Sequence, residues 1–273
     1  MMKKKWQFYT WLILFLFLMP FITVKIPGLN PEVREAVPES GRLVYAANLF
    51  DFEVEEDGEP AEPGGTGRAL MYFTHSHEAF APILQAKGGK AAVSHSKENI
   101  MNLGEAFNSH FGMNGIELDV LNYDNAGQMS QKGVPHSRAY KAIRPQVAKQ
   151  MEAEKYDLVL DVHRDSLGRN KTTLDYKGGP YAKVYFVIGE DHRGHKANRQ
   201  LAEKISARMN ELVPGISKGI FRKSGHGVDG IYNQDLGPHV LLIEMGGTEN
   251  TEEELNRTAA IVAKASAEVL AGR

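Results

Sequence analysis

The sequence contains no cysteine among its 273 residues. This absence excludes disulfides, thiolate metal sites, a lipid-modified cysteine and a cysteine nucleophile. Any metal ion would therefore be held by histidine and carboxylate side chains. The sequence also lacks a large excess of either positive or negative charge, since the formal net charge is −2. No basic stripe interleaved with aromatic residues follows the first few positions, and a nucleic-acid partner is therefore not expected.

A long apolar run occurs at the N-terminus, where Lys3, Lys4 and Lys5 precede the almost uninterrupted apolar segment 6–24. About 20 apolar residues are needed to cross a bilayer, so this segment is just long enough to be a single-pass anchor. The lysines predict a cytoplasmic N-terminus with the remainder outside the cell membrane. A cleavable signal peptide is the alternative, but residues 23–27 make a poor cleavage site.

The composition divides the chain into three parts. Residues 1–26 comprise the Lys-rich tip and the membrane anchor, and residues 27–66 form a flexible linker rich in Pro, Gly and acidic residues. Residues 67–273 are expected to form one folded catalytic domain.

Within this domain, apolar or alternating runs predict strands at 69–73, 116–120, 158–162, 184–188 and 240–243. Apolar residues at helical spacing lie between them, in segments 100–107, 142–151, 201–212 and 255–269. This alternation predicts an α/β domain with a mainly parallel sheet and helices on both faces. Segments 172–176 and 181–186 predict a hairpin with its turn at 177–180, and the Gly- and Gln-rich segment 125–135 is expected to be a loop.

Metal-capable side chains follow two of the predicted strands. His75 and Glu78 come directly after the run 69–73, and His163 follows the run 158–162. The spacing His75-x-x-Glu78 lets an imidazole and a carboxylate converge on one cation, and a distant histidine completes the two-His, one-Glu set of catalytic zinc hydrolases. Because α/β sheets place their sites at the carboxyl ends of strands, we expect Zn²⁺ to be held by His75, Glu78 and His163.

A third strand end supplies a base. Glu244 follows the run 240–243 and precedes Gly246 and Gly247, which would let a substrate approach closely. In this hypothesis zinc lowers the pKa of its water toward about 7. Glu244 then takes the proton and passes it to the leaving nitrogen.

Other polar residues near these strand ends have two interpretations each. His77 is expected to lie behind the ligands or in solvent. Glu98 is a reserve third ligand, although it could simply favour the N-terminal dipole of a helix. Arg164 and Asp165 could form a surface ion pair, or they could bind a substrate carboxylate and orient a ligand, respectively.

The segment before the Glu244 strand holds Asn233, Gln234 and Asp235, which are either ordinary turn residues or side chains that reach the cleft. Five further histidines are interpreted as surface or core residues; they are His95, His110, His136, His192 and His195.

Four ordered motifs together resemble those of the stage II sporulation protein P family. They are Thr74-His75-Ser76-His77-Glu78, Asp161-Val162-His163-Arg164-Asp165-Ser166, Tyr232-Asn233-Gln234-Asp235-Leu236 and the segment 242–250. The resemblance covers the chain from about residue 69 to the end, and the N-terminal anchor with its acidic spacer agrees with it.

The resemblance implies a membrane-anchored cell-wall hydrolase with a zinc-amidase-like α/β fold, similar to zinc-dependent N-acetylmuramoyl-L-alanine amidases. Such enzymes cleave the amide between N-acetylmuramic acid and the L-alanine of the stem peptide of peptidoglycan, and this family is also associated with endopeptidase action on cross-links. It further implies work at the mother-cell engulfing membrane during sporulation, together with stage II sporulation proteins D and M. By resemblance, His75 and His163 match the metal histidines, Glu78 a family glutamate, and Glu244 the catalytic carboxylate.

Two other functions fit the same residues. A zinc carboxypeptidase or endopeptidase acting on wall peptides would use the same His-x-x-Glu pair and distant histidine. A non-catalytic wall-binding scaffold would instead use the anchor and the spacer to recruit partners.

Overall fold

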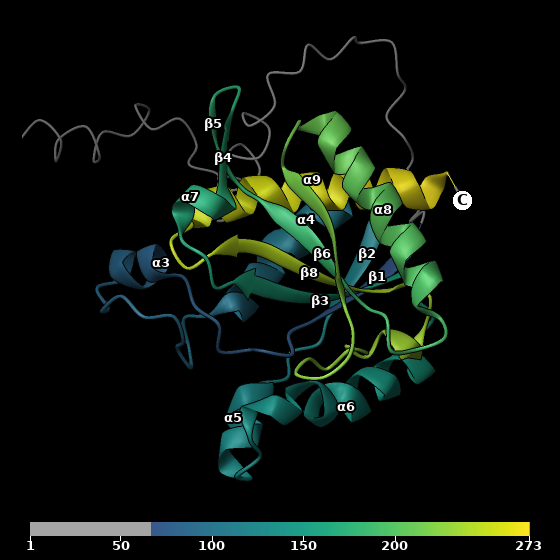
Figure 1. The fold of residues 1–273 in the computed structure, drawn as a ribbon. Helices are drawn as coiled ribbons and strands as arrows, with labels where there is room; N and C mark the ends of the chain where they lie inside the picture. The colour runs from purple at the N-terminus through teal and green to yellow at the C-terminus, as the bar shows by residue number, and fades with distance from the viewer. Residues whose placement is uncertain (1–66, 273) are drawn as a thin grey trace, which may run out of the picture. The chain divides into compact units, whose positions relative to one another are not determined.

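The computed structural model describes residues 67–272 (Figure 1). The predicted anchor and linker lie outside these residues. Within the described range, no helix is both long and apolar enough to cross a bilayer. The strands are β1 (Gly67–Tyr72), β2 (Ile116–Val120), β3 (Leu158–Asp165), β4 (Thr173–Tyr176), β5 (Gly179–Ala182), β6 (Val184–Gly189), β7 (Ser217–Lys223) and β8 (Val240–Gly247).

Helices connect most of these strands. The α-helices are α3 (Ala81–Ala86), α4 (Gly104–Met113), α5 (Asn125–Gln131), α6 (Ala139–Ala153), α7 (Arg169–Thr172), α8 (His195–Leu212) and α9 (Glu252–Ala271). Three short 3₁₀ helices are η1 (Ile100–Leu103), η2 (His136–Arg138) and η3 (Gln234–Leu236).

The central sheet has six strands in the order β2-β1-β3-β8-β6-β7. Strands β2, β1, β3 and β8 are parallel to one another, whereas β6 is antiparallel to β8 and parallel to β7. The sheet is therefore mainly parallel, as predicted, with a reversed pair at one edge. Because β1, β3 and β8 are neighbours and parallel, their carboxyl ends lie together, which positions the candidate site.

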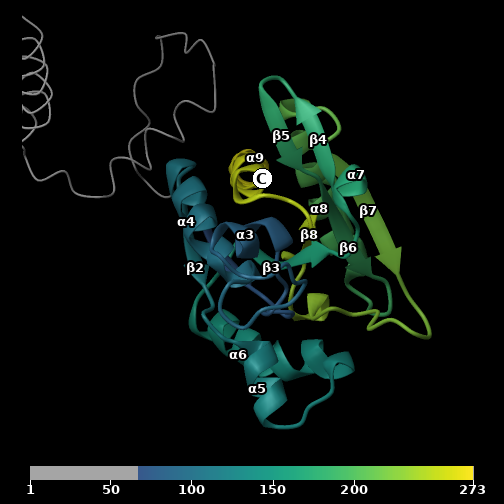
Figure 2. The same ribbon diagram turned by 90° about the vertical axis from the view of Figure 1, so that its left-hand side faces the viewer.

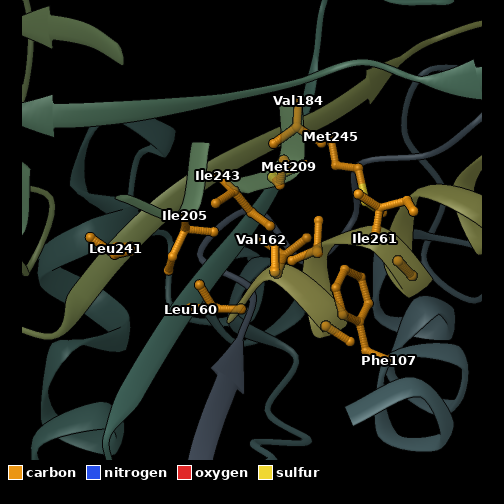
Figure 3. Packing of buried hydrophobic residues seen from close by; sticks show 14 of the residues in the cluster. Phe107, Leu160, Val162, Val184, Ile205, Met209, Leu241, Ile243, Met245 and Ile261 are labelled. Atoms are coloured by element: carbon orange, nitrogen blue, oxygen red, sulfur yellow. The ribbon is translucent and has the colours of Figure 1, made fainter. Parts of the chain in front are cut away.

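One face of the sheet is packed against α4, α8 and α9 (Figure 1). Figure 3 shows Phe107 of α4, Met209 of α8 and Ile261 of α9 meeting Val162 and Ile243 of the sheet. Burying each such side chain is worth about 1.5 to 3 kcal/mol. These helices follow from the spacing of their apolar residues, which returns to the same face every three or four positions.

The opposite face is covered in part by α6, whose Ile143 and Val147 pack on Leu70 of β1 and Val159 of β3. Side chains alternate between the faces of a strand, so this second face also receives the polar residues of β3 and β8. Helices thus cover both faces, as the sequence predicts.

All five predicted strands and the four predicted helices are confirmed, but several boundaries and elements differ. Strands β3 and β8 run past His163 and Glu244, because the two strands stay paired as far as Asp165 and Gly247. The hairpin is β4–β5, a separate two-stranded antiparallel sheet, and the segment from Val184 onward belongs to β6 instead.

Helices α3, α5 and α7 and strand β7 were not predicted, and two of these elements have a clear local cause. Residues Asn125–Gln131 form α5 rather than a loop, because the Asp124 side chain accepts a hydrogen bond from Gly127 N and caps the helix. Strand β7 has the sequence Ser-Lys-Gly-Ile-Phe-Arg-Lys, which lacks an apolar run. It is the outer strand of the sheet, and outer strands commonly carry lysine and arginine, which discourage pairing with other chains.

Candidate active site

The four residues predicted to carry the chemistry lie in one cluster at β1, β3 and β8. His75 and Glu78 lie in the turn that follows β1, and the rings of His75 and His163 have centroids 5.1 Å apart. His163 and Glu244 are register partners on the adjacent strands β3 and β8. Glu78 Oε2 accepts a hydrogen bond from Arg164 N, directly after His163 in the chain. Residues more than 150 positions apart therefore converge because parallel strands bring their carboxyl ends together.

Asp161 lies beside His163 and contacts it, and this residue was not singled out from the sequence. Its carboxylate is fully buried and accepts hydrogen bonds from Thr74 N at 2.9 Å and Thr74 Oγ1 at 2.6 Å. Its Oδ1 also lies 3.0 Å from His163 Nε2 as an ion pair, although that nitrogen makes no hydrogen bond within residues 67–272. Burial alone would lower the pKa of His163, but the Asp161, Glu78 and Glu244 carboxylates together outweigh it and raise the pKa to about 9.

Arg164 contacts both Glu78 and Val93, in the segment that follows β1. The residue is 8% exposed, and its guanidinium donates to Asp165 O and Val93 O, while its Nε has no partner in the part of the chain that the structure describes. Its backbone N–H positions Glu78. These contacts favour a positioning role for Arg164 over direct capture of a substrate carboxylate.

Glu244 is a half-buried residue, and one of its carboxyl oxygens is free to accept a hydrogen bond. Its Oε2 is buried and has no hydrogen-bond partner within residues 67–272. Burial raises the pKa of Glu244 to about 7; the nearby His163 opposes this shift, while the Glu78 and Asp165 carboxylates add to it. A carboxyl whose pKa lies near neutrality suits proton transfer in either direction.

Aromatic side chains form a wall beside the histidines. His136 of η2 stacks on His75 with ring centroids 4.3 Å apart, so this surface histidine belongs to the site, which the sequence did not indicate. Tyr140 of α6 lies 5.9 Å from His163 and 5.0 Å from Tyr232, measured between ring centroids. Burial and the neighbouring His163 and His136 lower the pKa of His75 to about 3, which keeps this imidazole neutral.

The donor set suits a zinc ion in its chemistry, although the side chains do not form a closed cage. Among residues 67–272, no group of three or more His, Asp or Glu side chains is arranged to hold a metal ion. Within the described part of the chain, His163 Nε2 and Glu244 Oε2 are nevertheless buried polar atoms without hydrogen bonds. The raised pKa of His163 indicates that the cluster favours positive charge. Neutral imidazole and carboxylate are ligands that zinc accepts.

Two of the predicted residues lie at the margin of the cluster. His77 Nε2 is 2.9 Å from Asp124 Oδ1, and Asp124 also accepts from Ser76 Oγ, so His77 braces the cap of α5. The reserve ligand Glu98 pairs instead with Lys87 and accepts from Asn102 Nδ2.

The segment before β8 is built into the protein framework. Gln234 is 1% exposed, accepts from Gly189 N and donates to Val187 O, which ties it to β6. Asn233 donates to Tyr140 O, and Asp235 forms a two-point ion pair with Arg144 of α6. These contacts hold Tyr140 and β8 in place beside the site.

The fold and the cluster define an α/β protein with a polar site at the carboxyl ends of neighbouring parallel strands, an arrangement that enzymes use to hold reacting groups rigidly. A model of the stage II sporulation protein P family matches residues 47–267, and the chain belongs to this family. A relative named stage II sporulation protein P, from Bacillus subtilis (strain 168), is 32% identical over 240 aligned residues, and the match covers 86% of this chain. This chain spans 60% of the length of that relative.

Solved structures share a more distant similarity. The CwlD amidase from Clostridioides difficile, determined in complex with the GerS lipoprotein, is 12% identical, covers 76% of this chain and 100% of its own, and has a TM-score of 0.47. The N-acetylmuramyl-L-alanine amidase Ami1 from Mycobacterium smegmatis is 12% identical, covers 76% of this chain and 98% of its own, and has a TM-score of 0.44. The chemistry of this chain must therefore be argued from its own residues.

Proposed function

We propose that this chain is a peptidoglycan hydrolase that acts in sporulation, and that it is a zinc-dependent N-acetylmuramoyl-L-alanine amidase. Membership of the stage II sporulation protein P family supports the setting. The observation that carries the chemistry is the buried Oε2 of Glu244, which has no partner among the described residues and lies in a cluster with His75, Glu78 and His163.

In this proposal His75, Glu78 and His163 hold the zinc ion. When bound, zinc acidifies a water molecule and polarises the scissile carbonyl. Glu244 accepts the proton of the attacking water and delivers it to the leaving nitrogen, for which a pKa of about 7 is well matched. Asp161 holds His163 in orientation, and Arg164 N holds Glu78.

The cellular setting forms part of the same proposal. Segment 6–24 would anchor the chain in the cell membrane with its N-terminus in the cytoplasm, leaving the catalytic domain outside. Peptidoglycan would be the substrate, remodelled during engulfment, and stage II sporulation proteins D and M would be partners at the mother-cell engulfing membrane.

Product analysis tests the reaction. Purified sacculi would be digested with the zinc-loaded full chain, and the products would be separated and weighed. Glycan strands freed of their stem peptides are expected. Intact stems with only the cross-links cut would replace the amidase with an endopeptidase, and stems shortened by their last residue would indicate a carboxypeptidase.

Metal analysis tests the site itself. One zinc ion per chain is expected to bind, and the His75→Ala, His163→Ala double variant is expected to lose it. A native chain that neither binds zinc nor releases soluble wall material would contradict the enzymatic function and favour a wall-binding scaffold.

A further inference from the structure

The sheet face that carries His163 and Glu244 continues past them to the open edge of the sheet. Tyr185 of β6 is the register partner of Glu244 in β8, so the two side chains share a face. Phe221 of β7 is the register partner of Val187, which lies two residues beyond Tyr185 and therefore on the same face. A row of side chains thus crosses β3, β8 and β6 to β7. The ribbon of β7 forms one edge of the sheet (Figure 2).

A bulge in β7 brings a lysine onto this row. The register between β6 and β7 shifts between Val184 and Phe186, where β7 contains one extra residue. Gly219 adopts a φ of +84° at this point, a conformation that glycine tolerates without strain. Bulges re-aim side chains and are frequent beside active sites. Here Lys218 Nζ lies 4.7 Å from the centroid of the Tyr185 ring.

Lys218 and Phe221 remain accessible from solvent. Phe221 is 43% exposed, and its ring meets that of Tyr185 with centroids 4.5 Å apart. The Lys218 side chain is 25% exposed, and its Nζ forms an ion pair with Asp165 Oδ2 at 3.6 Å, a distance too long for a hydrogen bond. The ammonium therefore keeps hydrogen-bond donors available for a bound group.

The charges around the row make Lys218 a suitable anchor for an anion. Glu78, Asp165 and Glu244 are acidic and would repel a substrate carboxylate placed between them. Arg164 is buried, and two of its guanidinium nitrogens donate to backbone carbonyls. Lys218 presents a positive charge at the accessible end of the row, one strand beyond the register partner of Glu244.

We propose that Lys218, Tyr185 and Phe221 form a substrate subsite that binds a carboxylate of the peptide part of the wall, beside the amide that is cleaved. Lys218 pairs with the carboxylate, and the exposed Phe221 ring packs against the aliphatic atoms next to it. This inference rests on the proposed function, because it concerns the substrate of the same site.

The test measures binding without turnover. The zinc-loaded full chain carrying Glu244→Gln would be titrated with N-acetylmuramoyl-L-alanyl-D-glutamate and with the same molecule in which both glutamate carboxyls are carboxamides. We expect the carboxylate form to bind about fivefold more tightly, the size typical of one partly exposed charge pair. Adding Lys218→Met should abolish this preference, and Lys218→Arg should retain it.

A matched control removes the same charge from the same strand. Arg222 is the register partner of Ile188 and faces the opposite side of the sheet, and its side chain is 61% exposed. Arg222→Met should keep the preference for the carboxylate. Equal binding of the two probes by the chain with Lys218 intact would overturn the subsite. A preference that survives Lys218→Met would overturn it as well, leaving Lys218 as a neutraliser of Asp165.

This outcome is separable from that of the proposed function. If the native chain cleaves sacculi while the probes bind equally, the enzyme stands and the subsite fails. If the native chain releases nothing from sacculi, the proposed function fails whatever the probes do.

Discussion

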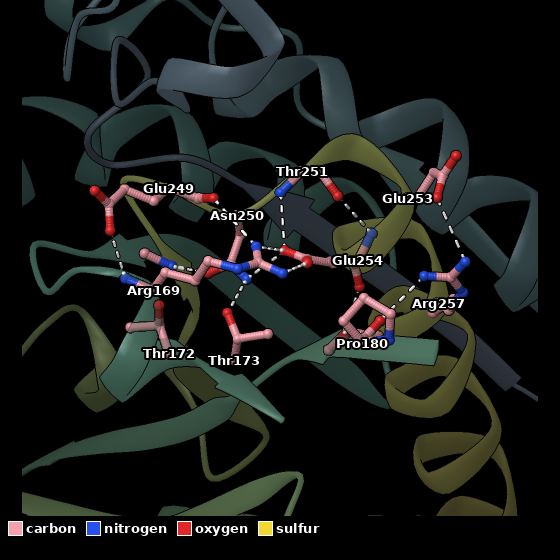
Figure 4. A network of polar contacts seen from close by, with 12 residues as sticks. Arg169, Thr172, Thr173, Pro180, Glu249, Asn250, Thr251, Glu253, Glu254 and Arg257 are labelled. Atoms are coloured by element: carbon pink, nitrogen blue, oxygen red, sulfur yellow. Dashed lines mark hydrogen bonds and ion pairs between the residues drawn. The ribbon is translucent and has the colours of Figure 1, made fainter. Parts of the chain in front are cut away.

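Two glutamates of the same domain, Glu254 and Glu244, differ in how many hydrogen bonds their buried carboxylate oxygens accept. Glu254 of α9 is 1% exposed and accepts from Asn250 Nδ2 at 2.8 Å, Thr251 N at 3.0 Å and Arg169 Nη1 at 2.9 Å (Figure 4). Burial alone would raise its pKa, but Arg169 and Thr251 outweigh burial and lower the pKa. Glu244 as a residue is only half-buried, yet its Oε2 is buried without a partner within residues 67–272, and its pKa is raised to about 7.

The difference indicates that one of these carboxylates stabilises the fold and that the other is suited to proton transfer. The Glu254 carboxylate closes the capping box of α9 with Thr251 and joins α7 to α9 through Arg169, so its charge is stabilised by the fold. The Glu244 carboxylate is kept poorly satisfied, which costs stability and leaves it free to exchange a proton. Substitutions at the two positions should therefore have opposite consequences.

The largest effect is expected for Glu244→Gln. Losing the proton acceptor should lower the rate of wall lysis by about 10² to 10⁴. The free energy of unfolding should stay equal or rise, because a neutral amide removes an unfavourable buried charge. Turbidity clearing of purified sacculi and urea unfolding measure the two quantities.

The control for this comparison is Glu117→Gln on β2, whose side chain is 69% exposed. It should change neither quantity. A Glu244→Gln chain that lyses walls at the native rate would remove Glu244 from the mechanism.

Glu254→Ala is expected to lower the stability of the fold and to leave the rate of wall lysis per folded chain almost unchanged. The change leaves Thr251 N without its acceptor, removes one of the two acceptors of Asn250 Nδ2, and frees Arg169. It should cost about 2 to 3 kcal/mol of unfolding free energy. Part of the Arg169 contribution is lost to solvent screening, since that side chain is 44% exposed. The rate per folded chain should remain close to native, as measured on samples corrected for the folded fraction.

Glu253→Ala is the neighbouring control, because Glu253 is 78% exposed and pairs only with Arg257 in the contacts described. Its cost should be at most about 0.5 kcal/mol. Equal costs at Glu253 and Glu254 would contradict the role assigned to the buried network.

The contrast between these glutamates also marks what the sequence could predict. The strands and the residues that follow them were predictable, because apolar runs fix strands and parallel strands align their ends. Asp161 was within reach, since the alternation in Leu158–Asp165 puts Asp161 and His163 on one face. His136, Tyr140 and Tyr232 were not, because their approach depends on how α6 and the loop before β8 pack, which no local pattern encodes.

A smaller effect is expected for Asp161→Asn, a residue that supports a proposed ligand. The substitution keeps the size of the side chain but weakens the charge that orients His163 and raises its pKa. Zinc affinity should fall about 10- to 100-fold, the range typical of groups that orient ligands. Competition with a chelator measures this, and unchanged zinc affinity would mean that His163 is held without Asp161.

The smallest expected effect is the change with pH in the stability that Glu254 contributes. Because the pKa of Glu254 is lowered in the folded protein, its contribution to stability is present above the usual pKa of a glutamate carboxyl. This contribution is lost as the pH falls through the folded pKa. The native chain should therefore be more stable than Glu254→Gln near neutral pH, and the two unfolding free energies should converge on acidification. Urea unfolding at a series of pH values measures the gap, with Glu253→Gln as a control that parallels the native chain throughout. A gap for Glu254→Gln that stays constant down to about pH 3 would mean that the charge of Glu254 adds nothing to the fold beyond its shape.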